Sequence, residues 1–346
     1  MIHVGIIGCG YWGPNLVRTF SELEEVRVAR VSDMRPERLS YIAARYPDVG
    51  RTSDPMELVE DPTIDAVVIA TPPRTHYELA MAALKAGKHV MVEKPLATST
   101  DEGTQIVALA ERLQRILLVG HLFLYAPAVV RIRSLLDEGK LGSLYYISAV
   151  RTNVGPPGSQ VDALWDLAPH DVSIILSLMK GCPKRVFAHG GSFTNAKLIE
   201  AAFLVLRFDD GRLAHVHVGW LTPNKARQMR LICSEGEVVY DDMQPVQKVQ
   251  VHNPAIDNRT QAAATGAALS YGSGGIWCPP LEAYEPLRAE CQDFLTSIQT
   301  GKRPLSDGWS GLEVVRVLEA ASRCLKDDSR SVLQLAGAPE PTGVML

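Results

Sequence analysis

The sequence predicts an α/β protein with a doubly wound parallel sheet at its N-terminal end and a large, mostly antiparallel sheet after it. The chain has 346 residues, more than one core ordinarily holds, so we expect two domains. Strand-like and helix-like segments alternate over residues 1–122, which is typical of a parallel sheet with helices on both faces. Over residues 123–346, strand-like runs follow one another with little helix between them.

Hydrophobic periodicity places the elements of the first domain. Beyond Pro14, apolar residues recur every three or four positions, as in a helix with proline in its first turn. Residues 66–70 are continuously apolar, the pattern of a strand buried on both faces of a parallel sheet. The expected strands are 2–7, 26–31, 66–70, 89–92 and 116–119, and the expected helices are one from Pro14, 36–46, 76–86 and 100–113.

The second domain is predicted to begin with a short helix and to end with two helices. Its expected helices are 128–136, 163–179, 287–298 and 311–325, and its expected strands are 144–151, 185–192, 200–208, 213–220, 229–234 and 237–241. Turn-forming residues such as Glu235-Gly236 separate several of these strands, which favours antiparallel pairing. Residues 253–275 are low in large apolar groups, so we expect a long loop or a mobile segment there.

Composition narrows the classes of partner and compartment. The net charge of −4 provides no basic surface for nucleic acid or anionic lipid. No apolar run is long enough to span a membrane, and the N-terminus lacks the features of a signal peptide. The six cysteines are scattered, without the spacing of a zinc site or a disulfide framework. We therefore expect a cytoplasmic protein with no metal, no nucleic-acid partner and no membrane partner.

A glycine-rich loop follows the first predicted strand. Gly8, Gly10 and Gly13 have the GxGxxG spacing, and a predicted helix comes directly after them. In that context the first glycine permits a tight turn, the second lets the backbone approach a pyrophosphate, and the third allows close packing of helix on strand. The helix N-terminus then offers free N–H groups to the phosphates. The loop predicts a dinucleotide site of the Rossmann type, and we expect Tyr11 and Trp12 within it to contact the cofactor.

Asp33 follows Gly13 by 20 residues, at the end of the second predicted strand. A carboxylate at this place accepts hydrogen bonds from the adenosine ribose and repels a 2′-phosphate, which favours NAD over NADP. Arg35 could neutralise such a phosphate, so NADP stays possible. The alternative for Asp33 is a cap of the following turn or helix.

Polar residues follow two further strands of the predicted parallel sheet. Thr71-Pro72-Pro73 follows one of them, with His76 shortly after, and Glu93-Lys94-Pro95 follows the next. Ligands of such sheets lie at the carboxyl ends of the strands, so both segments are expected to border the nicotinamide half of the cofactor. Lys94 would be a usable proton donor or acceptor there. The alternative is a solvated lysine at a strand end.

A second polar cluster lies at residues 165–171. Asp166 and His170 are four residues apart, so on a helix they share one face. A histidine beside a carboxylate is a candidate general acid/base. Pro169 favours an alternative in which the helix begins near Ala168 and Asp166 caps it, with Asp171 in the first turn.

These motifs, in this order and spacing, resemble the glucose–fructose oxidoreductase/inositol dehydrogenase (Gfo/Idh/MocA) family over nearly the whole chain. The resemblance implies a Rossmann domain followed by an α/β domain with a large sheet. It implies that Lys94 precedes a cis proline, that Lys94 and His170 flank the reacting alcohol, and that Asp166 helps to place the substrate. The implied reaction is reversible hydride transfer between nicotinamide C4 and a secondary alcohol carbon on a sugar or cyclitol ring.

The residues 11–15, 165–171 and 285–287 are most similar to a branch associated with surface-polysaccharide genes, in which nucleotide sugars are common substrates. Further candidates for substrate binding are His121, Tyr125, Arg151 and Asn153. Residues 120–125 are largely apolar, which disfavours a simple polyol and makes a flatter or less hydroxylated ring, such as a cyclic dihydrodiol, an alternative substrate. A cyclitol is another alternative substrate, and a non-catalytic dinucleotide-binding redox sensor is an alternative of a different class. Large sheets with one uncovered face tend to pair, so we expect a homodimer or homotetramer.

Overall fold

The computed structural model describes residues 1–155, 161–194, 196–253, 275–326 and 332–334. Residues 332–334 are described by their backbone alone. Their contacts form two compact units: residues 1–129 with 282–316, and residues 130–281 with the segment from 317 onward. The return of residues 282–316 to the first unit is not apparent from sequence. A domain boundary after residue 122 stays a prediction. The predicted loop 253–275 falls almost wholly outside the described residues.

The first unit is built on a parallel sheet of six strands in the order β3-β2-β1-β4-β5-β6. Its strands are β1 (Ile2–Ile7), β2 (Val26–Ser32), β3 (Gly50–Thr52), β4 (Ala66–Ile69), β5 (His89–Glu93) and β6 (Leu117–Gly120). Strand order reverses between β1 and β4. The carboxyl ends of these two strands therefore form the topological switch point at which doubly wound sheets bind ligands. The predicted doubly wound sheet is confirmed.

Helices connect these strands. They are α1 (Gly13–Ser21), α2 (Pro36–Arg45), α3 (Met56–Glu60), α4 (His76–Lys85) and α5 (Thr100–Arg112), and after β6 come the 3₁₀ turn η2 (Leu122–Tyr125) and α6 (Pro127–Asp137). Strand β3 and helix α3 were not predicted, because elements of three and five residues are too short to show a period.

One helix from the far end of the chain completes the core of the first unit. Helix α9 (Pro286–Thr300) buries Leu287, Cys291 and Phe294 in the same apolar cluster as Phe20 of α1. Helix α10 (Gly308–Lys326) follows it. Its residue Gly311 lies so close to Val119 of β6 that an added Cβ would collide with the valine side chain. The first unit therefore consists of two segments that are distant in the sequence.

The second unit contains, among the described residues, a nine-stranded sheet in the order β14-β13-β12-β11-β7-β10-β9-β8-β15. Its strands are β7 (Leu144–Val154), β8 (Arg185–Gly191), β9 (Ala201–Arg207), β10 (Leu213–Gly219), β11 (Leu221–Cys233), β12 (Gly236–Asp241), β13 (Val249–His252), β14 (Ile276–Trp277) and β15 (Val332–Gln334). Only the β7–β10 pair among them is parallel. The predicted mostly antiparallel sheet is confirmed.

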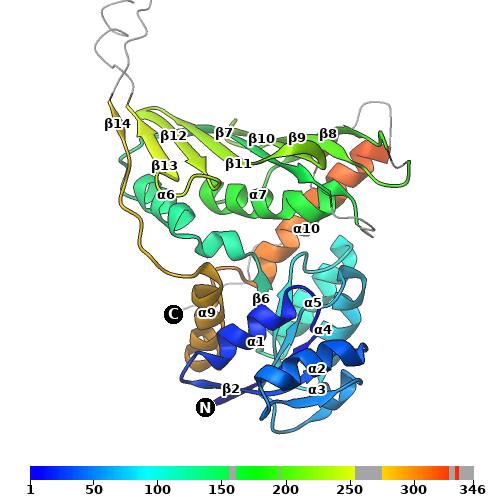
Figure 1. The fold of residues 1–346 in the computed structure, drawn as a ribbon. Helices are drawn as coiled ribbons and strands as arrows, with labels where there is room; N and C mark the ends of the chain where they lie inside the picture. The colour runs from blue at the N-terminus through cyan, green and yellow to red at the C-terminus, as the bar shows by residue number, and fades with distance from the viewer. Residues whose placement is uncertain (156–160, 195, 254–274, 327–331, 335–346) are drawn as a thin grey trace, which may run out of the picture. The chain divides into compact units, whose positions relative to one another are not determined.

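Helix α7 (Ala163–Met179) packs on one face of this sheet, while the other face carries no helix among the described residues (Figure 1). The side chain of Asp162 caps α7 by accepting a hydrogen bond from the N–H of Trp165 at 2.9 Å. Pro169 lies inside the helix. The alternative start near Ala168 is therefore wrong, because Asp162 satisfies the helix N-terminus one turn before Asp166.

Strand β11 is longer than predicted. It extends from Leu221, whereas apolar alternation indicated only residues 229–234. The first half of β11 is mostly exposed and polar, and its pairing with β7 shifts register between Leu221 and Ala226. The sequence shows no alternation there because neither side of this half-strand is a core face.

Candidate active site

The glycine loop between β1 and α1 has the steric features of a dinucleotide loop. Gly8 has φ +99°, and an added Cβ would collide with the carbonyl oxygen of Ala70, the residue after β4. An added Cβ on Gly13 would collide with the carbonyl oxygen of Gly8. A Cβ on Gly10 would meet only the side chain of Arg35, at 3.6 Å, so this position faces open space. The loop therefore leaves room at the one glycine where a pyrophosphate must approach.

Asp33 lies directly after β2 and is buried. Its Oδ2 accepts a hydrogen bond from the N–H of Cys9 at 2.8 Å, and its Oδ1 accepts from the N–H of Arg35 at 2.9 Å and from Arg35 Nε at 3.2 Å. Burial raises the pKa of Asp33, but the hydrogen bonds from Arg35 and Cys9 outweigh it, so the pKa is lowered. Asp33 is thus an anion that also caps its own turn and fixes the glycine loop.

Tyr11 and Trp12 are placed differently within the loop. The Tyr11 side chain is 92% exposed. Trp12 is half-buried and forms the N-cap position of α1, and its side chain lowers the pKa of the Glu93 carboxyl against the larger effect of burial. Trp12 therefore connects the glycine loop to the end of β5.

The loops that follow β4 and β5 are joined through His76. Its ring is fully buried, with Nδ1 2.8 Å from the carbonyl oxygen of Pro95 and Nε2 2.8 Å from that of Thr71. Burial lowers the pKa of His76. Both ring nitrogens already contact backbone carbonyl oxygens, so His76 positions the two loops. For the same reason we do not propose that its ring contacts the cofactor. Thr71 is tied to Thr75 by a 2.7 Å hydroxyl contact, and Pro72 and Pro73 form the turn between them.

Lys94 stands at the carboxyl end of β5 beside buried groups. The Lys94–Pro95 peptide bond is cis, as the family resemblance implies. Burial raises the pKa of Glu93 to about 7, against the opposing charge of Lys94. His121, directly after β6, is buried, and burial together with the charge of Lys94 lowers its pKa to about 3. At neutral pH, His121 is therefore uncharged.

These values give a first prediction, on stability. The Glu93 carboxyl has a pKa of 4.5 in its ordinary state and about 7 here. Between these two pKa values the folded protein keeps the Glu93 proton and the unfolded chain loses it. The contribution of Glu93 to the free energy of unfolding is therefore full below pH 4.5 and is lost as pH rises through about 7. We expect Glu93→Gln to reduce the fall in the urea midpoint between about pH 5 and about pH 8. Exposed Glu24→Gln should keep the wild-type fall, and an identical fall in Glu93→Gln would contradict the prediction.

Two of the predicted substrate-binding residues in the first unit lie in its interior. Tyr125 is 5% exposed, and its hydroxyl donates to Asp293 Oδ2 at 2.8 Å and lies 3.0 Å from Ser306 Oγ. Tyr125 therefore holds η2 against α9, so contact with substrate is not proposed for it. His121 is 1% exposed, and neither ring nitrogen has a hydrogen-bond partner among the described residues.

Glu290, which is fully buried on α9, was not among the predicted site residues. Burial, followed by the charges of Glu93 and Asp293, raises the pKa of Glu290 well above the ordinary value. A signal was present, because Glu290 falls between Leu287 and Phe294 on the apolar stripe of its helix.

In the second unit, helix α7 carries the other predicted acid/base pair. Asp166 and His170 are half-buried, whereas Leu167, Ala168 and Pro169 between them are buried. One side of this otherwise buried helix thus presents a carboxylate and an imidazole four residues apart.

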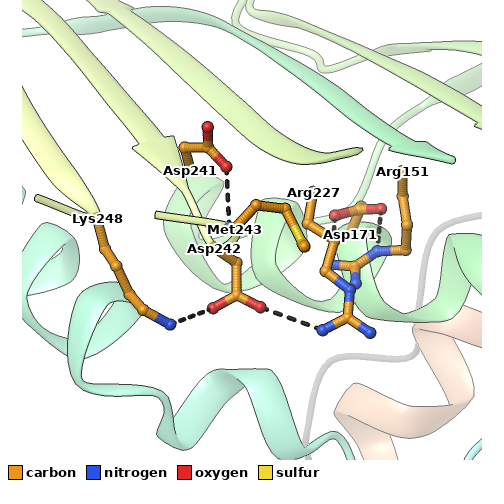
Figure 2. Close-up of polar contacts among 7 residues, drawn as sticks. All are labelled: Arg151, Asp171, Arg227, Asp241, Asp242, Met243 and Lys248. Carbon is orange, nitrogen blue, oxygen red and sulfur yellow. Dashed lines mark hydrogen bonds and ion pairs between the residues drawn. The ribbon is translucent and has the colours of Figure 1, made fainter. Parts of the chain in front are cut away.

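Asp171, the next residue of α7, points into the sheet. Its two carboxylate oxygens accept hydrogen bonds from Arg151 of β7, with Nε at 2.8 Å and Nη2 at 2.9 Å (Figure 2). Both side chains are about 95% buried. Asp171 is therefore not a first-turn partner of the helix dipole, and Arg151 holds α7 on the sheet. Asn153, two residues along β7, has a buried Oδ1 without a hydrogen-bond partner among the described residues.

Comparison with known proteins decides the family. Residues 2–121 match the model of an oxidoreductase family with an NAD-binding Rossmann fold, and residues 129–239 match the C-terminal domain of the same Gfo/Idh/MocA family. The chain belongs to the Gfo/Idh/MocA family. It is an oxidoreductase whose N-terminal part is an NAD-binding domain.

Similar proteins include named dehydrogenases. Inositol 2-dehydrogenase 2 of Saccharopolyspora erythraea is 27% identical over 98% of this chain and 97% of its own. UDP-N-acetylglucosamine 3-dehydrogenase of Acidithiobacillus ferrooxidans is 28% identical over 93% of this chain and 96% of its own. 1-carboxy-3-chloro-3,4-dihydroxycyclohexa-1,5-diene dehydrogenase of Comamonas testosteroni is 28% identical over 79% of this chain and 71% of its own.

Solved structures agree on the fold. The UDP-N-acetylglucosamine 3-dehydrogenase from Acidithiobacillus ferrooxidans gives a TM-score of 0.80 at 24% identity and covers 94% of this chain and 98% of its own. GenD2 from gentamicin A biosynthesis, solved in complex with NAD, gives 0.81 at 24% identity and covers 97% of each chain. Within the described part of this chain, no helix is long and apolar enough to cross a membrane.

Proposed function

We propose that this protein oxidises a secondary alcohol on the ring of a sugar or nucleotide sugar, and reduces the ketone in the reverse direction. The observation that carries this is the position of Lys94. It follows Glu93 at the carboxyl end of β5, which pairs with β4 beside the switch point of the sheet. Doubly wound sheets bind their ligands at this edge, which supports Lys94 as the proton-transfer group of the proposed reaction.

The reaction needs a base, since an alcohol that loses hydride must also lose its hydroxyl proton. Bound nicotinamide supplies the hydride acceptor at C4. We propose that His170 takes the hydroxyl proton, that Lys94 holds or shares it, and that Asp166 places the substrate by accepting hydrogen bonds from ring hydroxyls. The half-buried positions of Asp166 and His170 on α7 support these roles. Asn153 is proposed as a further substrate contact because its Oδ1 lacks a partner among the described residues.

NAD is the proposed cofactor in preference to NADP. The glycine loop would hold the pyrophosphate through Gly10 and the N-terminus of α1, and Asp33 would meet the adenosine ribose. Arg35 donates to Asp33, so the Asp33 carboxylate already neutralises the arginine that could otherwise bind the 2′-phosphate of NADP. The loops at Thr71-Pro72-Pro73 and Glu93-Lys94-Pro95 would border the nicotinamide half, with Tyr11 and Trp12 beside the phosphates.

Cofactor preference gives a second prediction. Wild-type protein should bind NAD more tightly than NADP, and Asp33→Ser should weaken NAD binding by about tenfold, since a charge-assisted hydrogen bond to the ribose is lost. Calorimetric titration with both dinucleotides measures this. Arg35→Ala serves as the matched variant, with a much smaller effect on NAD. Tighter binding of NADP by the wild-type protein would contradict the assignment.

A substrate panel tests the proposed reaction. Free sugars, UDP-N-acetylglucosamine, myo-inositol and a cyclic dihydrodiol would be offered with NAD, and absorbance of the reduced cofactor followed. Cyclitols and dihydrodiols are the second candidates, because relatives over most of this chain are named for such substrates. Tight NAD binding without oxidation of any alcohol in the panel would favour the redox-sensor alternative.

We propose further that the protein is a cytoplasmic homodimer or homotetramer. The sheet face without helices exposes large apolar side chains on three adjacent strands: Tyr146 of β7, Leu213 of β10, and Phe203 and Val205 of β9. The Phe203 ring also stacks on His217, with ring centroids 4.3 Å apart. Pairing of this face between two copies would bury it. Sedimentation equilibrium tests this, and the mass of a single chain would refute it.

A further inference from the structure

Three titratable side chains of the first unit bury polar atoms that have no hydrogen-bond partner among the described residues. These atoms are both carboxyl oxygens of Glu290, both ring nitrogens of His121 and Oε1 of Glu93. Glu290 is 0% exposed. Burying a polar atom without a partner costs free energy, so proteins contain few such atoms. The proposed mechanism gives Glu290 no role, and its burial therefore needs a reason.

Strands β5 and β6 bring Glu93 beside His121. Glu93 ends β5 and pairs with Gly120, which ends β6, in the parallel ladder. A Cβ on Gly120 would lie 2.9 Å from Glu93 Oε2, so the carboxyl lies against this glycine. Glu93 Oε2 also accepts a hydrogen bond from the backbone N–H of Lys94 at 3.3 Å. The Glu93 carboxyl is therefore held at the edge of the sheet, between the residues that follow β5 and β6.

Helix α9 brings Glu290 to the same edge. Asp293 follows Glu290 by three residues, so both lie on one side of the helix. Asp293 Oδ2 accepts a hydrogen bond from the hydroxyl of Tyr125 in η2, the turn that follows His121. Cys291 packs in an apolar cluster that includes residues of β5 and β6. The side of α9 that carries Glu290 therefore faces the ends of these two strands.

Electrostatic interactions connect the two glutamates. After burial, the charges of Glu93 and Asp293 raise the pKa of Glu290 further. Burial raises the pKa of Glu93 to about 7, but the charge and the N–H of Lys94 act in the opposite direction. Every influence on Glu290 thus favours its protonated form, whereas Lys94 favours the ionised form of Glu93. Of the two carboxyls, Glu93 is the one that ionises first.

Two adjacent buried carboxyls can satisfy each other with one proton. Like charges at such a site do not both form, so one carboxyl keeps its proton while the other ionises. The protonated carboxyl then has one O–H donor, and the ionised one is only an acceptor. A hydrogen bond from Glu290 to Glu93 would give a partner to one oxygen of each residue. It would also stabilise the ionised form of Glu93.

We propose that Glu290 is a positioning residue, whose protonated carboxyl donates a hydrogen bond to the Glu93 carboxylate and so keeps an anion beside Lys94. This inference rests on the proposed dehydrogenase function, in which Lys94 holds or shares the proton of the alcohol. An ionised Glu93 stabilises the positive charge that Lys94 carries with that proton. Oxidation of the alcohol should therefore increase with pH as Glu93 ionises.

Other charged and titratable groups surround the pair. From the elements packed against it they are Lys94, His121, Tyr125, Asp293 and Cys291, with Arg18 and Glu285 beyond Cys291. The pKa of His121 is about 3, and burial raises the pKa of Tyr125 and of Cys291, so these three keep their charge state around neutral pH. Arg18 and Glu285 form an ion pair with each other. A transition in turnover near about pH 7 is therefore assigned to Glu93.

The pH profile of kcat tests this role. In the wild-type protein we expect kcat for alcohol oxidation to rise with a midpoint at about pH 7. Glu290→Leu removes the donor, so the midpoint should move up by about one to two pH units, the equivalent of one hydrogen bond to a charged group, with the same plateau at high pH. Glu290→Gln keeps an N–H donor and should stay close to the wild-type midpoint. The control Gln292→Leu, exposed on the same helix, should leave the profile unchanged.

A role in packing alone predicts a different result, because it would lower kcat equally at every pH. An unchanged midpoint in Glu290→Leu would overturn the proposal. So would equal shifts in Glu290→Leu and Glu290→Gln, because the conservative variant would then have failed to rescue. A shift in His121→Leu with none in Glu290→Leu would place the donor on His121 and reject Glu290.

Infrared spectroscopy keeps the test separate from turnover, since the C=O stretch of a protonated carboxyl group is visible without a substrate. The wild-type protein should lose one such signal around pH 7. This transition should be absent from Glu93→Gln and should move to higher pH in Glu290→Leu. Identical transitions in wild type and Glu290→Leu would refute the carboxyl pair. If no alcohol is oxidised but the transition moves, the dehydrogenase function fails while the carboxyl pair stands.

Discussion

Replacing Lys94 with methionine is expected to lower kcat by about 10²- to 10⁴-fold, the range that a positioned acid/base group contributes. Methionine keeps the length and apolar stem of lysine but can neither donate nor accept the alcohol proton. The glycine loop and Asp33 are untouched, so NAD should bind with nearly wild-type affinity. Steady-state rates on the substrate that the panel identifies, together with calorimetric NAD titration, measure both quantities.

The matched control is Lys85→Met, an exposed lysine at the end of α4 in the same unit. It should keep wild-type turnover. If Lys94→Met also retained wild-type turnover, Lys94 would be a solvated strand-end lysine and the proposed mechanism would fail. A loss of NAD affinity equal to the loss of turnover would instead make Lys94 a cofactor-binding residue without a proton-transfer role.

A double variant separates shared from independent roles. If His170 removes the proton and Lys94 shares it, each single replacement already interrupts the same transfer. The double variant Lys94→Met, His170→Gln should then be little slower than the worse single variant, because residues that act as a unit are strongly non-additive. Losses that multiply would assign the two residues to independent steps.

Local patterns predicted the elements that carry the candidate site. The GxGxxG loop, the strand before Lys94 and the helix of His170 were all predictable, because each depends on residues close in sequence. The bounds 163–179 of α7 follow from apolar residues on most of its surface. The resemblance then implied how Lys94, Asp166 and His170 act, which periodicity alone does not.

The parts that sequence did not predict depend on contacts between distant residues. The periodicity of α9 indicates a helix but not its packing on α1, which lies at the other end of the chain. Arg151 and Asp171 were both singled out, yet as a pocket residue and a helix-dipole partner, since nothing local shows that β7 and α7 pair them. Arg227, Asp242 and Lys248 come together only through the β11–β12 ladder and the turn after it.

The Arg151–Asp171 pair gives the second large effect, on stability. Asp171→Ala should lower the free energy of unfolding by about 3–5 kcal/mol, because it leaves the Arg151 guanidinium buried without its counter-charge. Burial alone would lower the pKa of Arg151, and it is Asp171 that raises it. Because a chain with two compact units need not unfold in one step, hydrogen exchange of the β7 and α7 amides is the more direct measurement.

A double variant shows whether the loss of charge or the loss of packing destabilises Asp171→Ala. Arg151→Met combined with Asp171→Leu removes both charges and refills the space, so it should recover most of the lost protection, as replaced buried pairs often do. Arg230→Ala, which breaks the exposed pair with Glu237 on the same sheet, should cost less than about 1 kcal/mol. If Asp171→Ala were as mild as Arg230→Ala, the buried pair would not be what holds α7, and with it His170, on the sheet. If the double variant recovered nothing, shape rather than charge would account for the loss.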